Sequence, residues 1–522
     1  MRSFGLDNDQ LNRLFLKWSN FLIFAGLIAA WTAFAVLILV APIQEFVLRF
    51  IPDDGFYYLE IARRIGQGQG STFDGITRTN GYHPLWTLML VPLSHIMTVS
   101  RAMGLRLSIL LGAVLMAGAF CILARLSEQL NRETKALAVA IPASMLMFSS
   151  IYGMESPLAV FLFAWMLWEL QSLTLSPARW AQGFRLGFVS ALLILSRLDT
   201  VVFVVCLNAV VVLLWWRSRR QGNRIERLRG APILLCFGIQ ALAVLLFAAW
   251  NYIEFGHFIT VSAALKAGRH DSPLFSWLYA SWGGVPGIVS AILGVLALLA
   301  VREPLANPVL TTAASGTALY LLAIVVQGRG EVYHWYFTIP IFSSGLFVPP
   351  LIKMMTERLR RFKSLYVPLI AAAILLFIAS VGRRLYHPEY GQKQIAYQMA
   401  TWTASNSPPT AVFALTDCGL MAFFSERPCV NTDGLTCSFE FQESIRDRRV
   451  PEFLTAAGVN AIVTRRDRSP PVEPGSVAVL PIGIRQGIYG TAQPVHAIVS
   501  STPVKSQGDF ELWKILSLRP EL

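Results

Sequence analysis

The sequence predicts a polytopic α-helical membrane protein that carries a C-terminal α/β domain on one side of the bilayer. Of its 522 residues, 54% are hydrophobic and only 14% are charged, whereas soluble domains carry about a quarter charged residues. Apolar runs close to the ~20 residues that cross a bilayer recur along the chain as far as Val381. Beyond Val381 the apolar runs become short and rich in β-branched residues, which indicates strands.

Basic residues cluster in a few loops and give the chain a formal net charge of +13. Cytoplasmic loops of membrane proteins collect Lys and Arg, so this excess predicts loop orientation and no binding of nucleic acid. Residues 217–230 hold six arginines against one glutamate, and residues 353–363 hold five basic residues against one glutamate. We therefore place both segments in the cytoplasm.

The apolar runs predict about 11 transmembrane helices, with the N-terminus inside and the C-terminus outside. The expected spans are 20–41, 105–124, 136–151, 157–173, 185–196, 200–216, 231–251, 285–301, 307–326, 336–352 and 364–381. The first run is too long for a signal peptide and lacks a small-residue cleavage site, so we expect it to be retained. Residues 85–100 are apolar but short, and we expect an interfacial or re-entrant helix, because a full span there would place residues 217–230 outside.

These boundaries define two domains: a transmembrane module over residues 1–381 and a soluble extracytoplasmic α/β domain over residues 382–522. The segments "TAVFALTD", "VNAIVTRR", "SVAVLPIG" and "HAIVSS" are the predicted strands of the second domain. Cys418, Cys429 and Cys437 also lie there, and two of the three could pair in an oxidising compartment. The spacing does not say which two.

The first outer loop carries an unusual polar segment, "IPDDGFYYLEIARRIGQGQGSTFDGITRTNGYHPLW", residues 51–86. The pattern "DDGFYYLEIARRI" is helical, and an Asp at its start is a natural helix cap. The alternative is that Asp53 or Asp54 is catalytic or binds a metal. One carboxylate can cap while the other faces a cavity, so both interpretations can hold.

Further charged residues fall in the other predicted outer loops. In "SRLDT", Arg197 and Asp199 lie between two apolar runs, where each costs about 2.5–3.5 kcal/mol near the bilayer midplane. They either pair with each other and tether two helices, or face a polar cavity. Glu155 in "GMES" is a solvated loop residue or a site residue, and His83 before Pro84 is a turn residue or a site residue.

An outer basic cluster of Lys266, Arg269 and His270 runs against the usual charge bias. It indicates an anionic ligand, with lipid headgroups as the alternative. Tyr336 follows His334 where interfacial aromatic residues are expected, so it either anchors the helix or lines the site. Together, outer carboxylates that can take a proton from a hydroxyl and cations that can stabilise a departing phosphate fit transfer from a lipid-phosphate donor.

This layout resembles the GT-C superfamily of membrane glycosyltransferases, which use polyprenyl-phosphate sugars on the outer side of the membrane. The likeness extends to protein mannosyltransferase, aminoarabinose transferase and cell-wall arabinofuranosyltransferase families. The segment 51–86 is similar to the family's first loop, "YGMESPL" resembles its second-loop acidic motif, and "SRLDT" lies where relatives carry an Arg-Pro-Glu turn.

The resemblance implies an inverting transfer to a cell-envelope glycan, lipid or protein acceptor, with Asp53 or Asp54 as the base and Glu155 at the acceptor site. It implies a multi-pass protein of the bacterial inner membrane, monomeric, with its active site facing the periplasm. The residues implied to bind the donor phosphate are Lys266, Arg269, His334 and Arg197. The residues implied to line the pocket are Tyr57, Tyr82, His83, Asp199, His270 and Tyr336. A divalent cation, Mg, Mn or Ca, would be held by Asp53 and Glu155.

The main alternative is a transporter or flippase of a lipid-linked glycan. Such proteins often show inverted repeats and charges near the midplane. No repeat is visible here, and the polar residues gather on one predicted face, which favours the transferase.

Overall fold

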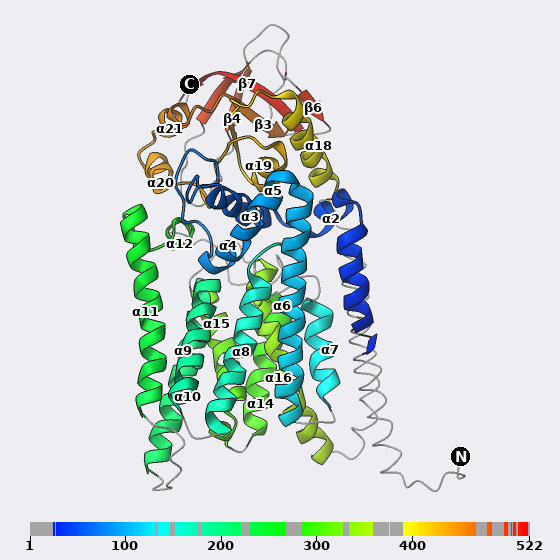
Figure 1. Ribbon diagram of the computed structural model, residues 1–522, viewed down its shortest axis with the longest axis vertical. Coiled ribbons are helices and arrows are strands. Elements are labelled where there is room, and N and C mark those ends of the chain that lie inside the picture. The colour runs from blue at the N-terminus through cyan, green and yellow to red at the C-terminus, as the bar shows by residue number, and fades with distance from the viewer. Residues whose placement is uncertain are drawn as a thin grey trace, which may run out of the picture.

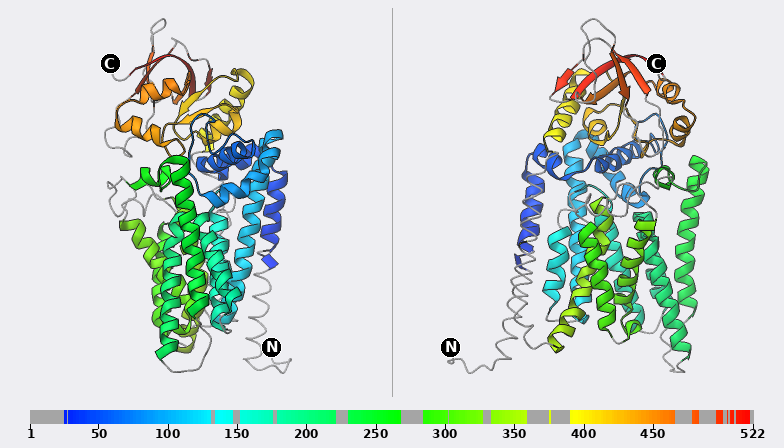
Figure 2. Two further views of the ribbon diagram at one scale, coloured as in Figure 1. Left: turned by 60° about the vertical axis from the view of Figure 1, so that its left-hand side comes forward. Right: turned by 180° about the vertical axis from the view of Figure 1, so that it is seen from behind.

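The computed structural model contains a bundle of helices with a β-sheet at one end (Figure 1). It describes residues 25–26, 28–130, 134–146, 152–175, 179–220, 230–267, 284–301, 303–326, 333–358, 375, 390–465, 478–482, 495–499, 503, 505–507 and 510–519. Between the bundle and the sheet lies a layer of short helices, and Figure 2 shows the same three layers from two further directions. The candidate site lies in this middle layer.

The bundle consists of long apolar helices that run along the long axis of the molecule. They are α6 (Arg101–Leu130), α7 (Lys135–Leu146), α8 (Ser156–Leu175), α9 (Trp180–Ser196), α10 (Val201–Arg220), α11 (Gly230–Phe255), α14 (Gly284–Ala300), α15 (Pro308–Val326) and α16 (Thr338–Arg358). Among the described residues, six helices are long and apolar enough to cross a membrane. The chain is therefore mostly helical with several candidate membrane helices.

Each of these nine helices overlaps one of the predicted spans, and a shorter apolar helix, Ile28–Val40, overlaps the first. Apart from Leu375, the predicted span at 364–381 lies outside the described residues. The count of about 11 crossings stays a prediction. At residues 85–100 the chain forms α4 (Pro84–Leu90), a 3-10 turn η1 (Val91–Leu93) and α5 (Ser94–Val99), none long enough to span a bilayer.

The middle layer is built on α3 (Asp53–Gly66), which follows α2 (Ile43–Phe50) and packs against α4, η1 and α5. Two acids occupy the first turn of α3 and two arginines its last turn, the arrangement that suits the helix dipole. Gly55 allows the close approach of the next loop, because a β-carbon there would collide with the carbonyl oxygen of Tyr152. The helix α12 (Val261–Ala267) lies at the same level.

The C-terminal part forms one mixed sheet with helices packed beside it. Its described strands are β1 (Phe413–Leu415), β2 (Cys429–Asn431), β3 (Ala461–Arg465), β4 (Ala478–Ile482), β5 (Val495–Val499), β6 (Lys505–Gln507) and β7 (Phe510–Arg519). Their order is β2-β1-β3-β7-β5-β4, with β6 also paired to β7. Strands β2, β1 and β3 are parallel, and β7 is antiparallel to β3 and β5. The accompanying helices are α18 (Tyr390–Asn406), α19 (Gly419–Ser425), α20 (Phe439–Arg446) and α21 (Val450–Ala456).

The four predicted strand segments coincide with β1, β3, β4 and β5. The strands β2, β6 and β7 were not predicted from the sequence. The first two are only three residues long, too short for a periodic pattern to show. The division of the chain at residue 382 remains a prediction.

Candidate active site

The predicted site residues that the structure describes gather at the end of the bundle that faces the sheet. The 3-10 turn η4 (Leu198–Thr200) lies at this end, and α10 runs from it to Arg220 at the opposite end of the bundle (Figure 1). The arginine-rich segment thus begins one full helix length away from the acids, as the predicted topology requires. Arg269 and His270 lie outside the described residues.

Asp53 joins the middle layer to the sheet layer. Its carboxylate accepts hydrogen bonds from the backbone N–H groups of Gly419, at 2.6 Å, and Leu420, at 2.8 Å. These are the first residues of α19, so Asp53 caps a helix 366 residues further along the chain. The ring of Phe423 on the same helix packs 5.6 Å from Phe56. The sequence suggested a cap within α3, and the structure instead uses Asp53 to cap α19.

Asp54 lies beside this contact with a partly buried carboxyl group. Burial raises its pKa to about 7, and the charges of Asp53, Asp433 and Asp417 act in the same direction, whereas Lys266 opposes them. Burial also raises the pKa of Asp53, but only to about 6, because the N–H donors of α19 stabilise its charged form. Both pKa values suit proton transfer near neutral pH, but both oxygens of Asp53 already accept N–H groups of α19, so Asp54 is the candidate base.

Two carboxylates of the sheet layer face α3, and neither was predicted from the sequence as a site residue. Asp433 is buried, and its Oδ2 accepts hydrogen bonds from the Tyr57 hydroxyl at 3.4 Å and the Asp417 N–H at 3.2 Å. Asp417 and Asp433 each follow a parallel strand by two residues, and the ends of these strands, Leu415 and Asn431, are in register. The repeated "TD" after two β-like runs is the sequence signal, since the carboxyl ends of parallel strands meet at one edge.

Lys266 is exposed on α12, and its Nζ donates to the Tyr336 hydroxyl at 3.2 Å. Two hydrogen bonds hold the start of α12: the Val261 N–H donates to Asn80 Oδ1 at 2.8 Å, and Gln442 of α20 donates to the Val261 carbonyl at 2.8 Å. The bundle end and the sheet layer together therefore place an accessible cation within electrostatic reach of Asp54.

Arg197 is the centre of a buried ionic network. Its guanidinium forms two hydrogen bonds to Asp199, at 2.9 and 3.2 Å, one to Glu155 Oε1 at 3.3 Å and one to the Trp335 carbonyl at 2.9 Å. The Tyr336 ring covers its face at 4.6 Å. This geometry is the mutual Arg–Asp pair that the sequence left open, and it engages most of the Arg197 donors. The predicted roles of Arg197 in binding the donor phosphate and of Asp199 in lining the pocket stay predictions.

Glu155 and His83 form the edge of this network. His83 Nδ1 faces the Leu198 N–H at 3.4 Å, so the neutral ring carries its proton on Nε2, which lies 3.8 Å from Glu155 Oε1. Burial lowers the pKa of His83, which favours this neutral form. Glu155 is buried, with its Oε1 turned to Arg197. The Glu155 carboxylate thus helps to orient both Arg197 and His83.

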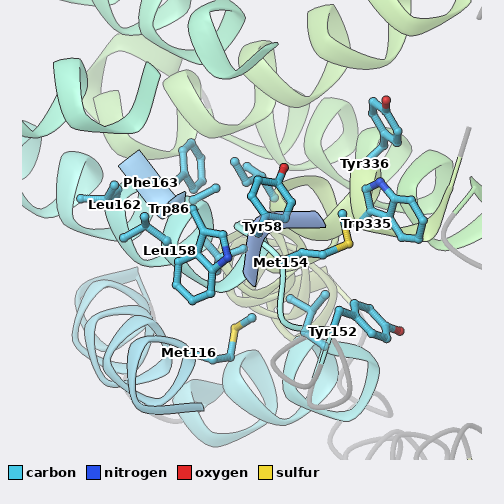
Figure 3. Close-up of a cluster of buried hydrophobic side chains, with 14 of the residues drawn as sticks. Tyr58, Trp86, Met116, Tyr152, Met154, Leu158, Leu162, Phe163, Trp335 and Tyr336 are labelled. Atoms are coloured by element: carbon cyan, nitrogen blue, oxygen red, sulfur yellow. The ribbon is translucent and has the colours of Figure 1, made fainter. Parts of the chain in front are cut away.

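The remaining predicted residues contribute to packing. Tyr82 hydrogen-bonds Ser71 within the first loop at 2.6 Å. His334, in the 3-10 turn η6 (His334–Phe337), packs edge-on against Tyr152 at 4.7 Å. Figure 3 shows a cluster of buried hydrophobic side chains, in which Tyr58, Trp86, Met154 and Trp335 come together from different elements. Trp86 donates to the Gly153 carbonyl at 3.0 Å, which fixes the loop that carries Glu155.

The described residues do not fit the divalent cation that the family resemblance implies. Among them, no three His, Cys, Asp or Glu side chains lie where they could share a metal ion. Both oxygens of Asp53 are already bound to backbone N–H groups, and Glu155 is paired with Arg197. The divalent cation therefore stays a prediction.

Comparison with known proteins shows a likeness of fold to solved structures and a match of the C-terminal part to one family model. Residues 384–508 match a family model described as "Domain of unknown function (DUF8728)". No curated protein matches the chain. Crystal structures of ArnT from Cupriavidus metallidurans match it bound to undecaprenyl phosphate, with TM-score 0.57, and in the apo state, with TM-score 0.56. In both cases the identity is 13%, and the match covers 94% of this chain and 98% of that chain.

The Archaeoglobus fulgidus oligosaccharyltransferase in complex with Zn and sulfate matches at TM-score 0.45 and 12% identity, over 83% of this chain and 68% of that chain. The fold of this chain is therefore similar to that of ArnT over nearly its whole length. Among the described residues, six helices are also long and apolar enough to cross a membrane.

Proposed function

We propose that the protein is a GT-C glycosyltransferase that moves a sugar from a polyprenyl-phosphate-linked donor to a hydroxyl group of a cell-envelope acceptor, outside the cytoplasmic membrane. The observation that carries this proposal is that Asp54, whose pKa is raised to about 7, lies within electrostatic reach of the accessible cation Lys266. The ArnT-like fold supports the choice of donor, because ArnT was crystallised with undecaprenyl phosphate.

In this mechanism the Asp54 carboxylate takes the proton from the acceptor hydroxyl. The oxygen attacks the anomeric carbon from the side opposite the phosphate, the bond between that carbon and the phosphate oxygen breaks, and the configuration inverts. Lys266 stabilises the negative charge on the departing phosphate. Asp54 then releases its proton to solvent. Asp53 positions α19, and the Glu155–Arg197–Asp199 network positions Tyr336, which contacts Lys266.

The direct test is glycan and lipid analysis of a strain that lacks the gene, complemented with the wild-type gene or with Asp54→Asn. We expect one sugar to be missing from an envelope glycan, lipid or protein, and to return only with the wild-type gene. Envelope glycoconjugates that are unchanged in the deletion strain would overturn the proposal.

Replacing Lys266 is expected to weaken binding of the donor phosphate. Loss of a hydrogen bond to a charged group costs about 1.5–3 kcal/mol, so Lys266→Gln should bind undecaprenyl phosphate roughly 10- to 100-fold more weakly. Thermophoresis of the detergent-solubilised protein measures this affinity. The matched control is Lys135→Gln at the opposite end of the bundle, where the lysine pairs with Glu128 at 3.4 Å. Equal affinities of the two variants would place the phosphate elsewhere.

The raised pKa of Asp54 also predicts how stability changes with pH. A carboxyl group whose pKa is higher in the folded protein than in the unfolded chain, about 3.9, binds its proton more tightly when folded. Its contribution therefore favours folding below about pH 4 and is lost as the pH rises through about 7. Asp54→Asn should raise the thermal unfolding midpoint more at pH 8 than at pH 5. A gain that does not depend on pH would contradict the assignment.

A further inference from the structure

The buried thiols of Cys418 and Cys429 lie next to each other in the sheet layer. Both are free thiols that are completely shielded from solvent, and the charge of Cys429 would act directly on Cys418. Cys418 immediately precedes α19, and Cys429 begins β2. Because β2 pairs in parallel with β1, the segment that follows β1 is brought back beside β2. The fold thus places two thiols that are eleven residues apart in the sequence near each other and away from solvent.

The third cysteine of this region has different neighbours. Cys437 is buried against the first outer loop, where the Thr77 side chain hydrogen-bonds it and Asp74 lies nearby. Cys206 and Cys236 lie in bundle helices, and Cys121 is in α6. Of the three pairings that the sequence left open, the described contacts favour only that of Cys418 with Cys429.

We infer that Cys418 and Cys429 form a structural disulfide in the mature protein. The reaction joins the two sulfur atoms and removes two protons and two electrons. The electrons pass to the disulfide of an extracytoplasmic thiol–disulfide oxidoreductase, which is reduced to a dithiol. Burial raises the pKa of Cys418, and neither sulfur is accessible in the folded protein, so exchange must precede closure of the sheet layer. The bond is therefore a structural disulfide and not a reversible redox switch.

The disulfide would stabilise the part of the sheet layer that faces the candidate site. Cys418 lies between Asp417 and Gly419, whose N–H group binds Asp53, and Cys429 lies four residues before Asp433. A bond between the two sulfurs therefore ties together the two loops that place the sheet-layer carboxylates beside α3. Closing a short loop also removes conformational freedom from the unfolded chain, which stabilises the fold.

The test is peptide mapping of the full-length protein, purified from membranes without reductant and denatured in iodoacetamide. We expect a cross-linked peptide pair that contains Cys418 and Cys429 and disappears after reduction, together with an alkylated Cys437. The cross-link should persist in Cys437→Ser, and Cys418 should become alkylated in Cys429→Ser. Full alkylation of Cys418 and Cys429 in the wild-type protein, or a cross-link to Cys437, would overturn the inference. Neither result depends on glycosyl transfer, which the deletion strain tests separately.

Discussion

Asp54→Asn is expected to lower glycosyl transfer by at least about 100-fold, because general-base catalysis contributes about 10²- to 10⁴-fold. Asparagine keeps the size and the hydrogen-bonding oxygen of the side chain but cannot accept the proton of the acceptor hydroxyl. The geometry around it should survive, since the contacts that join α3 to α19 are made by Asp53 and Phe56. The measurement is the rate of transfer with the donor and acceptor that the deletion strain identifies.

The neighbouring residue provides the matched control. Asp53→Asn removes the charge from the cap of α19 but leaves one acceptor oxygen, so we expect a lower unfolding temperature and a smaller loss of transfer. Undecaprenyl phosphate should bind Asp54→Asn as it binds the wild type. If Asp53→Asn abolishes transfer at an unchanged unfolding temperature while Asp54→Asn retains it, Asp53 is the base and the assignment made here is wrong.

The sequence was informative wherever one local stretch carried the signal. A run of apolar residues identifies a membrane-length helix without reference to any partner, and the described bundle helices overlap the predicted spans. The short run at residues 85–100 is another local case, because its limited length does not fit a full span. The adjacent acids at the start of α3 also stand out locally, and they do lie at the end of the bundle beneath the sheet.

The sequence could not supply the partners of those acids. The N–H groups that donate to Asp53 lie 366 and 367 residues away in the sequence. Nothing in the sequence of α19 indicates that a distant side chain caps this helix. Asp417 and Asp433 follow strands of only three residues, and their meeting depends on parallel pairing of those strands. The role of Arg197 likewise depended on geometry, since "SRLDT" fits a paired or a free guanidinium equally well. Local sequence thus located the acids, whereas tertiary packing determines which acid is available for chemistry.

Glu60→Gln is expected to be among the most destabilising single substitutions in the chain. The Glu60 carboxylate is 1% exposed and lies within hydrogen-bonding distance of Arg63 at 2.5 Å, Arg64 at 3.0 Å and Arg101 at 2.7 Å. Burial alone would raise its pKa, but the Arg63 hydrogen bond and the three positive charges outweigh burial and lower it to about 2. Neutralising Glu60 leaves these guanidinium groups without their shared counter-charge, which costs about 3–5 kcal/mol.

The same residue allows the effect of burial to be separated from the effect of charge. Glu45→Gln makes an identical chemical change in an exposed pair with Arg49 at 3.0 Å, where the expected cost is within about 1 kcal/mol. Because the folded pKa of Glu60 is depressed, its contribution is present above the unfolded value, about 4.3, and is lost as the pH falls through about 2. At pH 7 the thermal midpoint should therefore fall far more in Glu60→Gln than in Glu45→Gln. Equal midpoints would mean that the three arginines find other partners or reach water, and that Glu60 does not fasten α3 to the start of α6.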